Sequence, residues 1–405
     1  MERRETAEAF ALDFDAPGFL DDPYPHYHAL REHDPVFLSP WGDWYLSRHA
    51  DVAGVLTGRS FCRESPKGAN PISKDDRAQT PIDRMLSQWM VFIDPPAHTR
   101  VRRLVGHAFT PRLIAAMRPE IEAMADWLLE EALDGADFDL IRDFAYPFPV
   151  MVVSRILGVP EEDYEKLRDL SGQLTAALDT GAAAQLATGI DATEALTAYM
   201  AELVGECRRR PRGDLLSEIV SGGEAAALSE EALLANCVFL LWAGHETTKN
   251  LIGNGVLALA RNPQELERLV EEPGLIVPAV DELLRFESPI QKIGRWAAED
   301  VEIGGKAIPK HSYVVSLFGA ANRDPARYPS PDRLDIARNN GASLAFGKGT
   351  HHCLGYGLAK LEGEIAIARL LAKTARIEVK TDRPRWQANT SVRGLESLPL
   401  SLLPS

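Results

Sequence analysis

The feature that most constrains the fold is one uninterrupted helical pattern over residues 229–261. Ser229 can cap this helix, and Glu230 and Glu231 suit the positive end of its dipole. Asn262 and Pro263 then end it. At 1.5 Å per residue, about 32 residues form a rod of roughly 50 Å, long enough to cross a whole domain. The remaining elements must therefore pack around this rod.

The rest of the chain predicts a mainly α fold with a minor β part. Residues 35–47 alternate like a small strand pair, and 293–315 resemble short strands with turns at Gly304-Gly305 and Pro309. Residues 63–88 are polar and predict a long loop with room for one helical turn. No linker divides the chain, so a single domain over 1–405 is expected. Helical periodicity covers roughly 97–132, 146–158, 161–179, 190–210, 278–286 and 354–373.

Composition excludes several classes of partner. The formal net charge of −15 argues against general nucleic-acid binding and against docking on anionic lipid. No signal peptide is visible, and the longest uncharged, largely apolar run, 232–244, is shorter than a membrane span requires. The four cysteines are scattered without a CxxC spacing, which disfavours a structural zinc site and favours a reducing compartment. We therefore expect a cytoplasmic protein without a membrane anchor.

Residues 346–355 read FGKGTHHCLG, a glycine-rich loop around Cys353. Glycines let the backbone curl so that amide N–H groups can point at sulfur. The helix expected after Cys353 offers its positive end to a thiolate, and an aromatic ring can keep water away from the sulfur. A free buried cysteine in a turn is the ordinary alternative for a lone cysteine.

This segment resembles the FGxGxHxCxG signature of the cytochrome P450 family at all of its fixed positions. The resemblance implies haem b as cofactor, with Cys353 as the axial ligand of its iron. A thiolate ligand pushes electron density toward oxygen and favours O–O cleavage. The matching residues, which would surround the cofactor, are Phe346, Gly347, Gly349, His351, Cys353 and Gly355.

The middle of the long helix reads AGHETT over 243–248. Small residues and hydroxyls there invite a distortion of the helix that would let a flat cofactor approach. The segment resembles the family's AGx[DE]T motif, which implies that Ala243 and Gly244 lie at the cofactor. By the same resemblance Thr247 contacts bound dioxygen and Glu246 helps to relay protons. The alternative is a helix–helix contact with Glu246 in a salt bridge.

Two further sets of residues support the resemblance. Glu282 and Arg285 match the family's ExxR pair, and Arg333 would complete a buried network behind the cysteine loop, although an ordinary surface pair is common. Haem carries two carboxylates, which attract cations and hydrogen-bond donors. The positions that match the family's propionate contacts are His98, Arg102, Arg295 and His351.

The implied reaction is the insertion of one oxygen atom from O₂ into a hydrophobic small molecule by a monomeric enzyme. No flavin or ferredoxin segment is fused to the chain, so a separate ferredoxin or flavodoxin must supply electrons. Exposed basic residues beside the cysteine loop would receive it, with Arg103, Arg112, Lys348 and Lys360 as candidates. By resemblance, the substrate pocket would be lined by Trp89, Met90, Val91, Phe239, Ala243, Ile290, Gln291, Ile293 and Val392.

Three alternatives remain open at this stage. A haem-thiolate sensor or carrier would have the cysteine loop without the acid–alcohol pair. A helical binding module would bind no haem. An enzyme of the same fold could instead catalyse isomerisation, C–C bond formation or dehydration.

Overall fold

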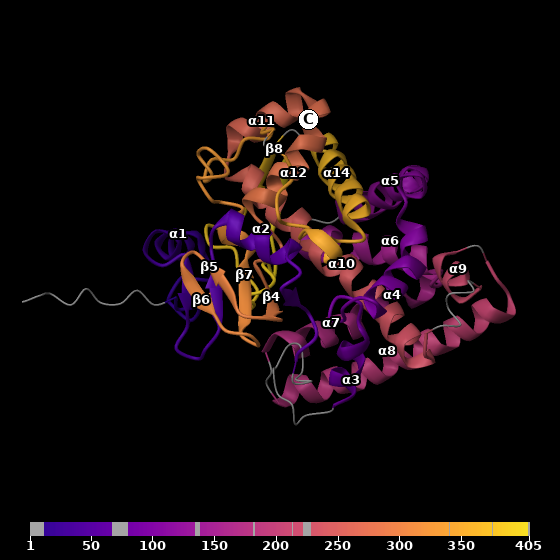
Figure 1. The fold of residues 1–405 in the computed structure, drawn as a ribbon. Coiled ribbons are helices and arrows are strands. Elements are labelled where there is room, and N and C mark those ends of the chain that lie inside the picture. The colour runs from indigo at the N-terminus through magenta and orange to yellow at the C-terminus, as the bar shows by residue number, and fades with distance from the viewer. Residues whose placement is uncertain are drawn as a thin grey trace, which may run out of the picture.

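The computed structural model describes residues 12–66, 80–133, 138–180, 183–212, 214–221, 228–339, 341–374 and 376–403. Helices make up most of this part of the chain, and a small β-sheet lies to one side of them (Figure 1). The architecture is therefore mainly α with a minor β part, as the sequence predicts. Within these residues, no helix is long and apolar enough to span a membrane.

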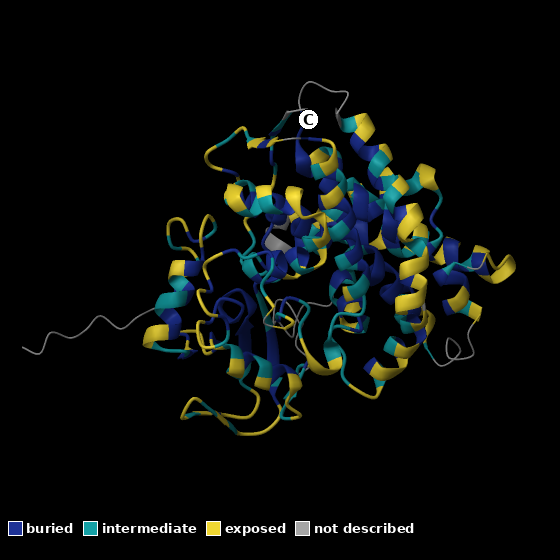
Figure 2. Cartoon of the chain, turned by 90° about the horizontal axis from the view of Figure 1, so that it is seen from above, coloured by how far each residue is buried: buried dark blue, intermediate teal, exposed yellow. Residues whose placement is uncertain are grey.

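The predicted rod is α10 (Glu230–Ala260), the longest described helix. Its cap is the predicted one, because the Ser229 hydroxyl accepts a hydrogen bond from the Ala232 N–H at 3.1 Å. Pro263 begins the next helix one turn later. Most side chains of α10 are buried. Figure 2 shows that buried residues, in dark blue, gather in the interior, whereas exposed residues, in yellow, lie toward the outside. The helix therefore forms the centre of the molecule.

The other helices cover α10 from several sides, and α3, α6, α8, α12 and α14 contact it directly. They are α1 (Tyr24–His33), α2 (His49–Thr57), α3 (Pro81–Gln88), α4 (Ala97–Gly106), α5 (Pro111–Leu133), α6 (Pro147–Leu157), α7 (Tyr164–Thr180), α8 (Ala183–Arg209), α9 (Leu215–Ser221), α11 (Pro263–Glu271), α12 (Ile276–Phe286), α13 (Phe318–Ala321) and α14 (Tyr356–Ala372).

Two predicted elements differ from the structure. The helical pattern over 97–132 is two helices, because α4 ends at Gly106 and α5 begins at Pro111 after a short 3₁₀ turn. The predicted loop 63–88 contains α3, whose start is fixed by a capping box between Thr80 and Asp83. Polar composition hid this helix, since its apolar residues occupy only one face. Residues 67–79 of that loop lie outside the described part of the chain.

The main sheet has five strands in the order β1-β2-β7-β4-β3. The predicted strand pair within 35–47 is confirmed as an antiparallel hairpin of β1 and β2. β2 pairs with β7 in parallel, whereas β4 pairs antiparallel with both β7 and β3. The strands are β1 (Val36–Leu38), β2 (Trp44–Leu46), β3 (Phe61–Cys62), β4 (Lys292–Ala297) and β7 (Tyr313–Leu317), with separate pairs β5 (Val301–Ile303) with β6 (Lys306–Ile308) and β8 (Arg376–Val379) with β9 (Leu400–Leu403).

The centre of α10 differs from its two ends in accessibility. Most of the helix is buried, but Trp242, Ala243, Gly244 and Thr247 are partly accessible although they lie in the middle of the molecule. Side chains of neighbouring elements therefore leave part of this helix face uncovered. This is the face on which the sequence predicts a cofactor.

Candidate functional site

The cysteine loop is a tight turn that only glycine can make at two positions. Gly347 and Gly349 have φ values of +68° and +74°, in the left-handed region that disfavours other residues. A Cβ on Gly349 would also lie 2.5 Å from the Leu56 carbonyl oxygen. The turn closes when the Cys353 N–H donates to the Phe346 carbonyl at 2.9 Å. This curl presents Cys353 directly before α14.

The Cys353 residue is partly buried. Burial raises its pKa to about 11, although the Gly355 N–H that donates to sulfur and the nearby Arg102 charge both act in the opposite direction. The thiol is therefore neutral in the protein alone. A metal cation bound to the sulfur favours the thiolate far more strongly than these two groups do.

The predicted contacts of the haem carboxylates converge from three parts of the chain. His98 and Arg102 come from α4, Arg295 from β4 and His351 from the cysteine loop. The rings of His98 and His351 lie 4.2 Å apart between their centroids. Burial lowers the pKa of His98 to about 4, and the charges of His351 and Arg102 add to this effect. The cluster therefore combines two guanidinium groups with two histidine rings whose pKa values are lowered, and the Arg102 charge acts on the Cys353 thiol.

One guanidinium of this cluster has no carboxylate partner. Arg295 is 4% exposed, its one hydrogen-bond acceptor among the described residues is the Gly294 carbonyl, and burial lowers its pKa well below the usual range. The Nδ1 atom of buried His98 has no hydrogen-bond partner among the described residues. Buried charges without partners are costly. The two carboxylates of a haem would supply the missing partners, so the residues present fit this group.

The acid–alcohol pair, Glu246 and Thr247, lies at the centre of α10. The α-helix is continuous here, so the expected distortion is absent, and the Thr247 hydroxyl donates to the Ala243 carbonyl at 3.4 Å. The Glu246 carboxylate is 2.7 Å from the Lys249 ammonium and 3.6 Å from His245 Nε2. Sequence analysis allowed for such a salt bridge but did not identify Lys249, although the i, i+3 spacing signals it.

Electrostatics keep Glu246 ionised. Burial by itself raises the pKa of this carboxyl, but the charges of Lys249 and His245 and the hydrogen bond from Lys249 outweigh it, so the pKa is lowered. His245 is fully buried and bonds the Leu241 carbonyl and the Ser171 hydroxyl, as expected for a packing histidine. The ion pair borders a pocket of about 480 Å³ that is also lined by Arg142, Tyr146, Gln387 and Glu396.

Gly244 has a packing role in the structure. A Cβ at this position would lie 2.7 Å from Cγ2 of Val153 in α6, so the absence of a side chain lets α6 and α10 approach closely. The helix-contact interpretation therefore applies to Gly244. Its partly accessible neighbour Ala243 remains a candidate for contact with a cofactor.

The ExxR pair is buried, as predicted, but its third member is different. Arg285 donates to both oxygens of Glu282, at 2.6 and 2.8 Å. The second arginine on Glu282 is Arg338, at 3.0 Å, so the prediction of Arg333 is wrong. The Arg333 residue is exposed, and its backbone carbonyl instead accepts hydrogen bonds from Arg285 and Arg338. The turns between residues 329 and 338 bring the later arginine back to the carboxylate.

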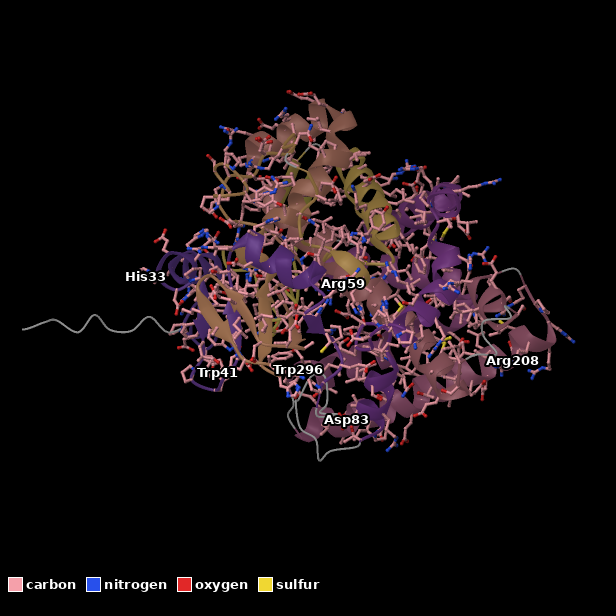
Figure 3. The ribbon with its side chains drawn as sticks, in the orientation of Figure 1. His33, Trp41, Arg59, Asp83, Arg208 and Trp296 are labelled. Carbon is pink, nitrogen blue, oxygen red and sulfur yellow. The ribbon has the colours of Figure 1, made fainter. Side chains whose placement is uncertain are left out.

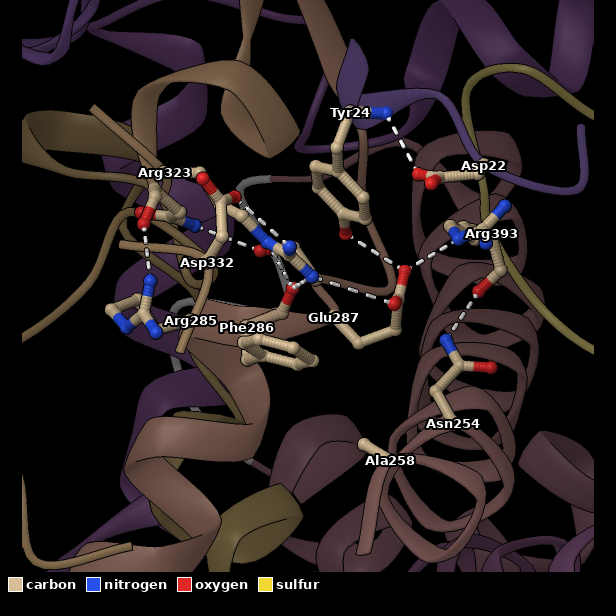
Figure 4. Close-up of polar contacts among 12 residues, drawn as sticks. Asp22, Tyr24, Asn254, Ala258, Arg285, Phe286, Glu287, Arg323, Asp332 and Arg393 are labelled. Atoms are coloured by element: carbon tan, nitrogen blue, oxygen red, sulfur yellow. Dashed lines mark hydrogen bonds and ion pairs between the residues drawn. The ribbon is translucent and has the colours of Figure 1, made fainter. Parts of the chain in front are cut away.

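Part of the predicted pocket lining faces open space. Val91, Ile290, Ile293 and Val392 are partly accessible, and an isolated β-bridge brings Ile290 beside Val392. Arg393, the residue after Val392, is held by a polar network in which Glu287 accepts hydrogen bonds from the Tyr24 hydroxyl and from Arg393 (Figure 4). This network holds the C-terminal segment against the end of α12.

The other predicted lining residues are enclosed by protein. Trp89 and Phe239 belong to an aromatic cluster, with 5.0 Å between their ring centroids, and Met90 is 6% exposed. Gln291 is 2% exposed and its Oε1 points at Gly319, so the structure does not support the prediction that it offers a polar contact to a ligand. Gly319 has no side chain, and the amide of Gln291 fills that space.

The site also contains residues that sequence analysis missed. Arg63 follows β3 and donates from Nε to the Val91 carbonyl at 2.7 Å and from Nη1 to the Gly294 carbonyl. Asp94 accepts the Arg63 and Glu64 backbone N–H groups, each at 2.9 Å. No local pattern distinguishes Arg63 from a surface arginine, because its partners come from distant segments.

Comparisons with known proteins agree with this geometry. The cytochrome P450 family model matches residues 191–395. The chain is 40% identical to a vitamin D(3) 25-hydroxylase of Pseudonocardia autotrophica, covering 95% of each chain. It is 37% identical to a biotin biosynthesis cytochrome P450 of Bacillus subtilis, covering 95% of this chain and 97% of the relative.

A solved structure shows the same fold. The crystal structure of P450BioI in complex with an acyl carrier protein ligated to hexadec-9Z-enoic acid superposes with a TM-score of 0.88 at 36% identity, covering 95% of this chain and 98% of that one. Full-length similarity of sequence and fold, together with a cysteine loop beside two arginines and two histidines, leads to one assignment. The chain belongs to the cytochrome P450 family of haem-dependent monooxygenases.

Proposed function

We propose that this protein binds haem b through Cys353 and inserts one oxygen atom from O₂ into a hydrophobic small molecule. The observation that carries this proposal is the convergence of the Cys353 loop with buried Arg295, which has no carboxylate partner among the described residues, and with the unpartnered Nδ1 of His98. When bound, the haem supplies the oxygen activation, and the protein binds, orients and shields the reactants.

Different groups of the chain would hold the iron and the carboxylates of the haem. Cys353 would ligate the iron, and the Gly355 N–H would stabilise negative charge on sulfur. The cations would bind the two haem carboxylates, which restores the charge balance of the cluster. The cations are Arg102 and Arg295, and the rings of His98 and His351, whose pKa values are lowered by burial, would add hydrogen-bond donors.

Glu246 and Thr247, in the middle of α10, would supply protons to the reactants. Glu246 borders a pocket whose other walls include Arg142 and Glu396, both substantially exposed to solvent. The carboxylate can therefore exchange protons with water in this pocket. The Thr247 hydroxyl, held only weakly by the Ala243 carbonyl at 3.4 Å, is free to turn toward a reactant.

The substrate would be apolar. The partly accessible residues Val91, Ala243, Ile290, Ile293 and Val392 offer only hydrocarbon surface to a ligand. The relatives are consistent with this, since one is described as a vitamin D(3) hydroxylase and another was crystallised with an acyl-loaded carrier protein. A terpenoid, a steroid or a fatty acyl chain fits this lining.

Electrons would come from a separate ferredoxin or flavodoxin. Arg103, Arg112 and Lys348 are exposed, whereas Lys360 is paired with Asp281 at 2.7 Å. A Cβ on Gly357 would lie 3.2 Å from Ile114, so the start of α5 borders the start of α14. This proximity supports a shared docking surface that would include Arg112 on α5 and Lys360 on α14. We propose a cytoplasmic monomer in which residues 1–405 act as one domain.

The absorption spectrum of the reduced protein with carbon monoxide tests the haem ligand. A strongly red-shifted Soret band is expected for the wild type, and Cys353→Ala should lose it because no thiolate remains. Cys62→Ala is the matched control, since Cys62 is also a free, partly buried cysteine. A red-shifted band that survives in Cys353→Ala would refute the ligand assignment.

Turnover tests the oxygenase assignment. With a supplied ferredoxin and reductase, Thr247→Ala should consume electrons but form less product, because proton supply to the reactant is disturbed. A wild type with the expected spectrum but no oxygenated product from terpenoid, steroid and fatty acyl compounds would favour the sensor or carrier alternative.

A further inference from the structure

Arg63 lies at a crossing of three segments that surround the candidate haem site. It is 7% exposed, and its guanidinium reaches the Val91 carbonyl before α4 and the Gly294 carbonyl in β4. The same guanidinium lies 4.8 Å from the centroid of the Phe92 ring. Arg63 therefore joins a wall of the substrate pocket to the strand that carries Arg295.

Two guanidinium groups share one acceptor at this point. Arg63 and Arg295 both donate from Nη1 to the carbonyl oxygen of Gly294. Burial lowers the pKa of Arg295, and the charge of Arg63 adds to this effect. Burial also lowers the pKa of Arg63. Two buried like charges at such short range are unfavourable unless an anion lies beside them.

The carboxylates of Asp94 and Glu64 lie near this pair, and both are engaged by backbone N–H groups. Asp94 accepts the backbone N–H groups of Arg63 and Glu64 and lies 3.8 Å from His351 Nε2. Among the described residues, neither guanidinium has a carboxylate within ion-pair distance. The Glu64 carboxylate accepts the Asp94 backbone N–H at 2.9 Å. A haem would bring two carboxylates that can pair with the guanidinium groups.

We propose that Arg63 is the third guanidinium of the haem-carboxylate site and a positioning residue for its rim. Its charge compensates a haem carboxylate, while its hydrogen bonds hold the Val91 and Gly294 carbonyls in place. This rests on the proposed haem site. It goes beyond the positions that match family motifs, since Arg63 lies in none of them.

Two variants of Arg63 separate charge from hydrogen bonding. Arg63→Lys keeps the positive charge but loses the planar fork of donors. Arg63→Gln keeps an amide donor but loses the charge. Arg59→Gln is the matched control, because Arg59 is an exposed arginine in the preceding turn (Figure 3). All three proteins are tested as full-length holoproteins.

The first measurement is the rate of haem transfer to excess apomyoglobin. Loss of one charge-assisted interaction should speed haem release roughly tenfold in Arg63→Gln, which corresponds to about 1.4 kcal/mol. The second measurement is the haem reduction potential. Removal of a nearby positive charge disfavours the added electron, so Arg63→Gln should have a lower potential than the wild type. Arg63→Lys should stay close to the wild-type potential.

A purely structural role predicts a different pattern. Both Arg63 variants would then lose thermal stability, but neither would shift the potential relative to Arg59→Gln. That result would overturn the proposal, and so would unchanged haem release in Arg63→Gln. A wild type without a haem spectrum would instead refute the proposed function itself, and with it this inference.

Discussion

The buried pair of Glu246 and Lys249 predicts an unusual pH dependence for one variant, Lys249→Met. The side chains are 7% and 5% exposed, and the ammonium lies 2.7 Å from the carboxylate. Methionine has nearly the same length and shape as lysine but no charge. The substitution therefore leaves Glu246 buried without its cation. The titratable neighbour of Glu246 that remains on α10 is His245, whose Nε2 lies 3.6 Å from the carboxylate. Burial lowers the pKa of His245, so this ring is a poor replacement for the lysine charge.

The sign of the pH effect follows from the direction of each pKa shift. In the wild type the pKa of Glu246 is lowered, so its contribution to stability is present above the unfolded pKa, about 4.3, and is lost as the pH falls through the folded value. In Lys249→Met burial dominates and raises the pKa of Glu246. The folded variant then holds a proton that the unfolded chain releases, so its stability falls as the pH rises above about 4.3.

The expected loss is therefore small in acid and large at neutral pH. Breaking a buried ion pair from one side costs about 3–5 kcal/mol when the remaining group must stay charged. Urea unfolding followed by circular dichroism, at about pH 4.5 and about pH 7.5, measures both values. The double variant Lys249→Met with Glu246→Gln is the control and should recover most of the loss at neutral pH. An equal loss at the two pH values would refute this reasoning, because a packing defect does not depend on pH.

Three further pairs of measurements test other parts of the structure. Glu362 is 1% exposed, and burial raises its pKa well above the usual range. In urea unfolding, Glu362→Gln should therefore become more stable than the wild type as the pH rises above about 4.3. The difference should grow by about 1.4 kcal/mol per pH unit until the folded pKa of Glu362 is reached. Arg338→Met should cost about 3 kcal/mol in thermal unfolding, whereas exposed Arg333→Met should change stability by less than about 0.5 kcal/mol. Gly244→Ala should destabilise the protein by about 1–3 kcal/mol through overpacking. Gly54→Ala, in open space on α2, should instead stabilise the protein by up to about 1 kcal/mol. Equal effects of the two substitutions would contradict the close approach of α6 to Gly244.

Local patterns were sufficient for the long helix and for the cysteine loop. The extent of α10 follows from Ser229, which caps it, and from Asn262 and Pro263, which end it, and all of these act within a few residues. The left-handed turns at Gly347 and Gly349 are likewise local, since glycine adopts such φ values without the steric cost that a Cβ brings. The position of the candidate iron ligand was therefore predictable without any tertiary information.

Local sequence patterns predicted the structure less well where a helix has a mostly polar composition and where a helical pattern is interrupted. The segment 80–88 reads as a polar loop, yet α3 forms because Thr80 and Asp83 cap each other and one apolar face packs inward. The continuous periodicity over 97–132 hid the interruption before Pro111, although a proline inside a helical pattern is a local signal of a helix start. Both differences concern where an element begins or ends.

The partners of buried charges were decided only by the tertiary structure. The sequence by itself determined that Glu282 and Arg285 share a helix face, but chain turns more than forty residues away bring Arg338, and not Arg333, to the same carboxylate. In the same way Arg63 becomes part of the site because β3 pairs with β4. A buried charge is stabilised by whichever opposite charge or dipole the fold brings within a few ångströms, and that choice depends on contacts between distant segments, which no local pattern encodes.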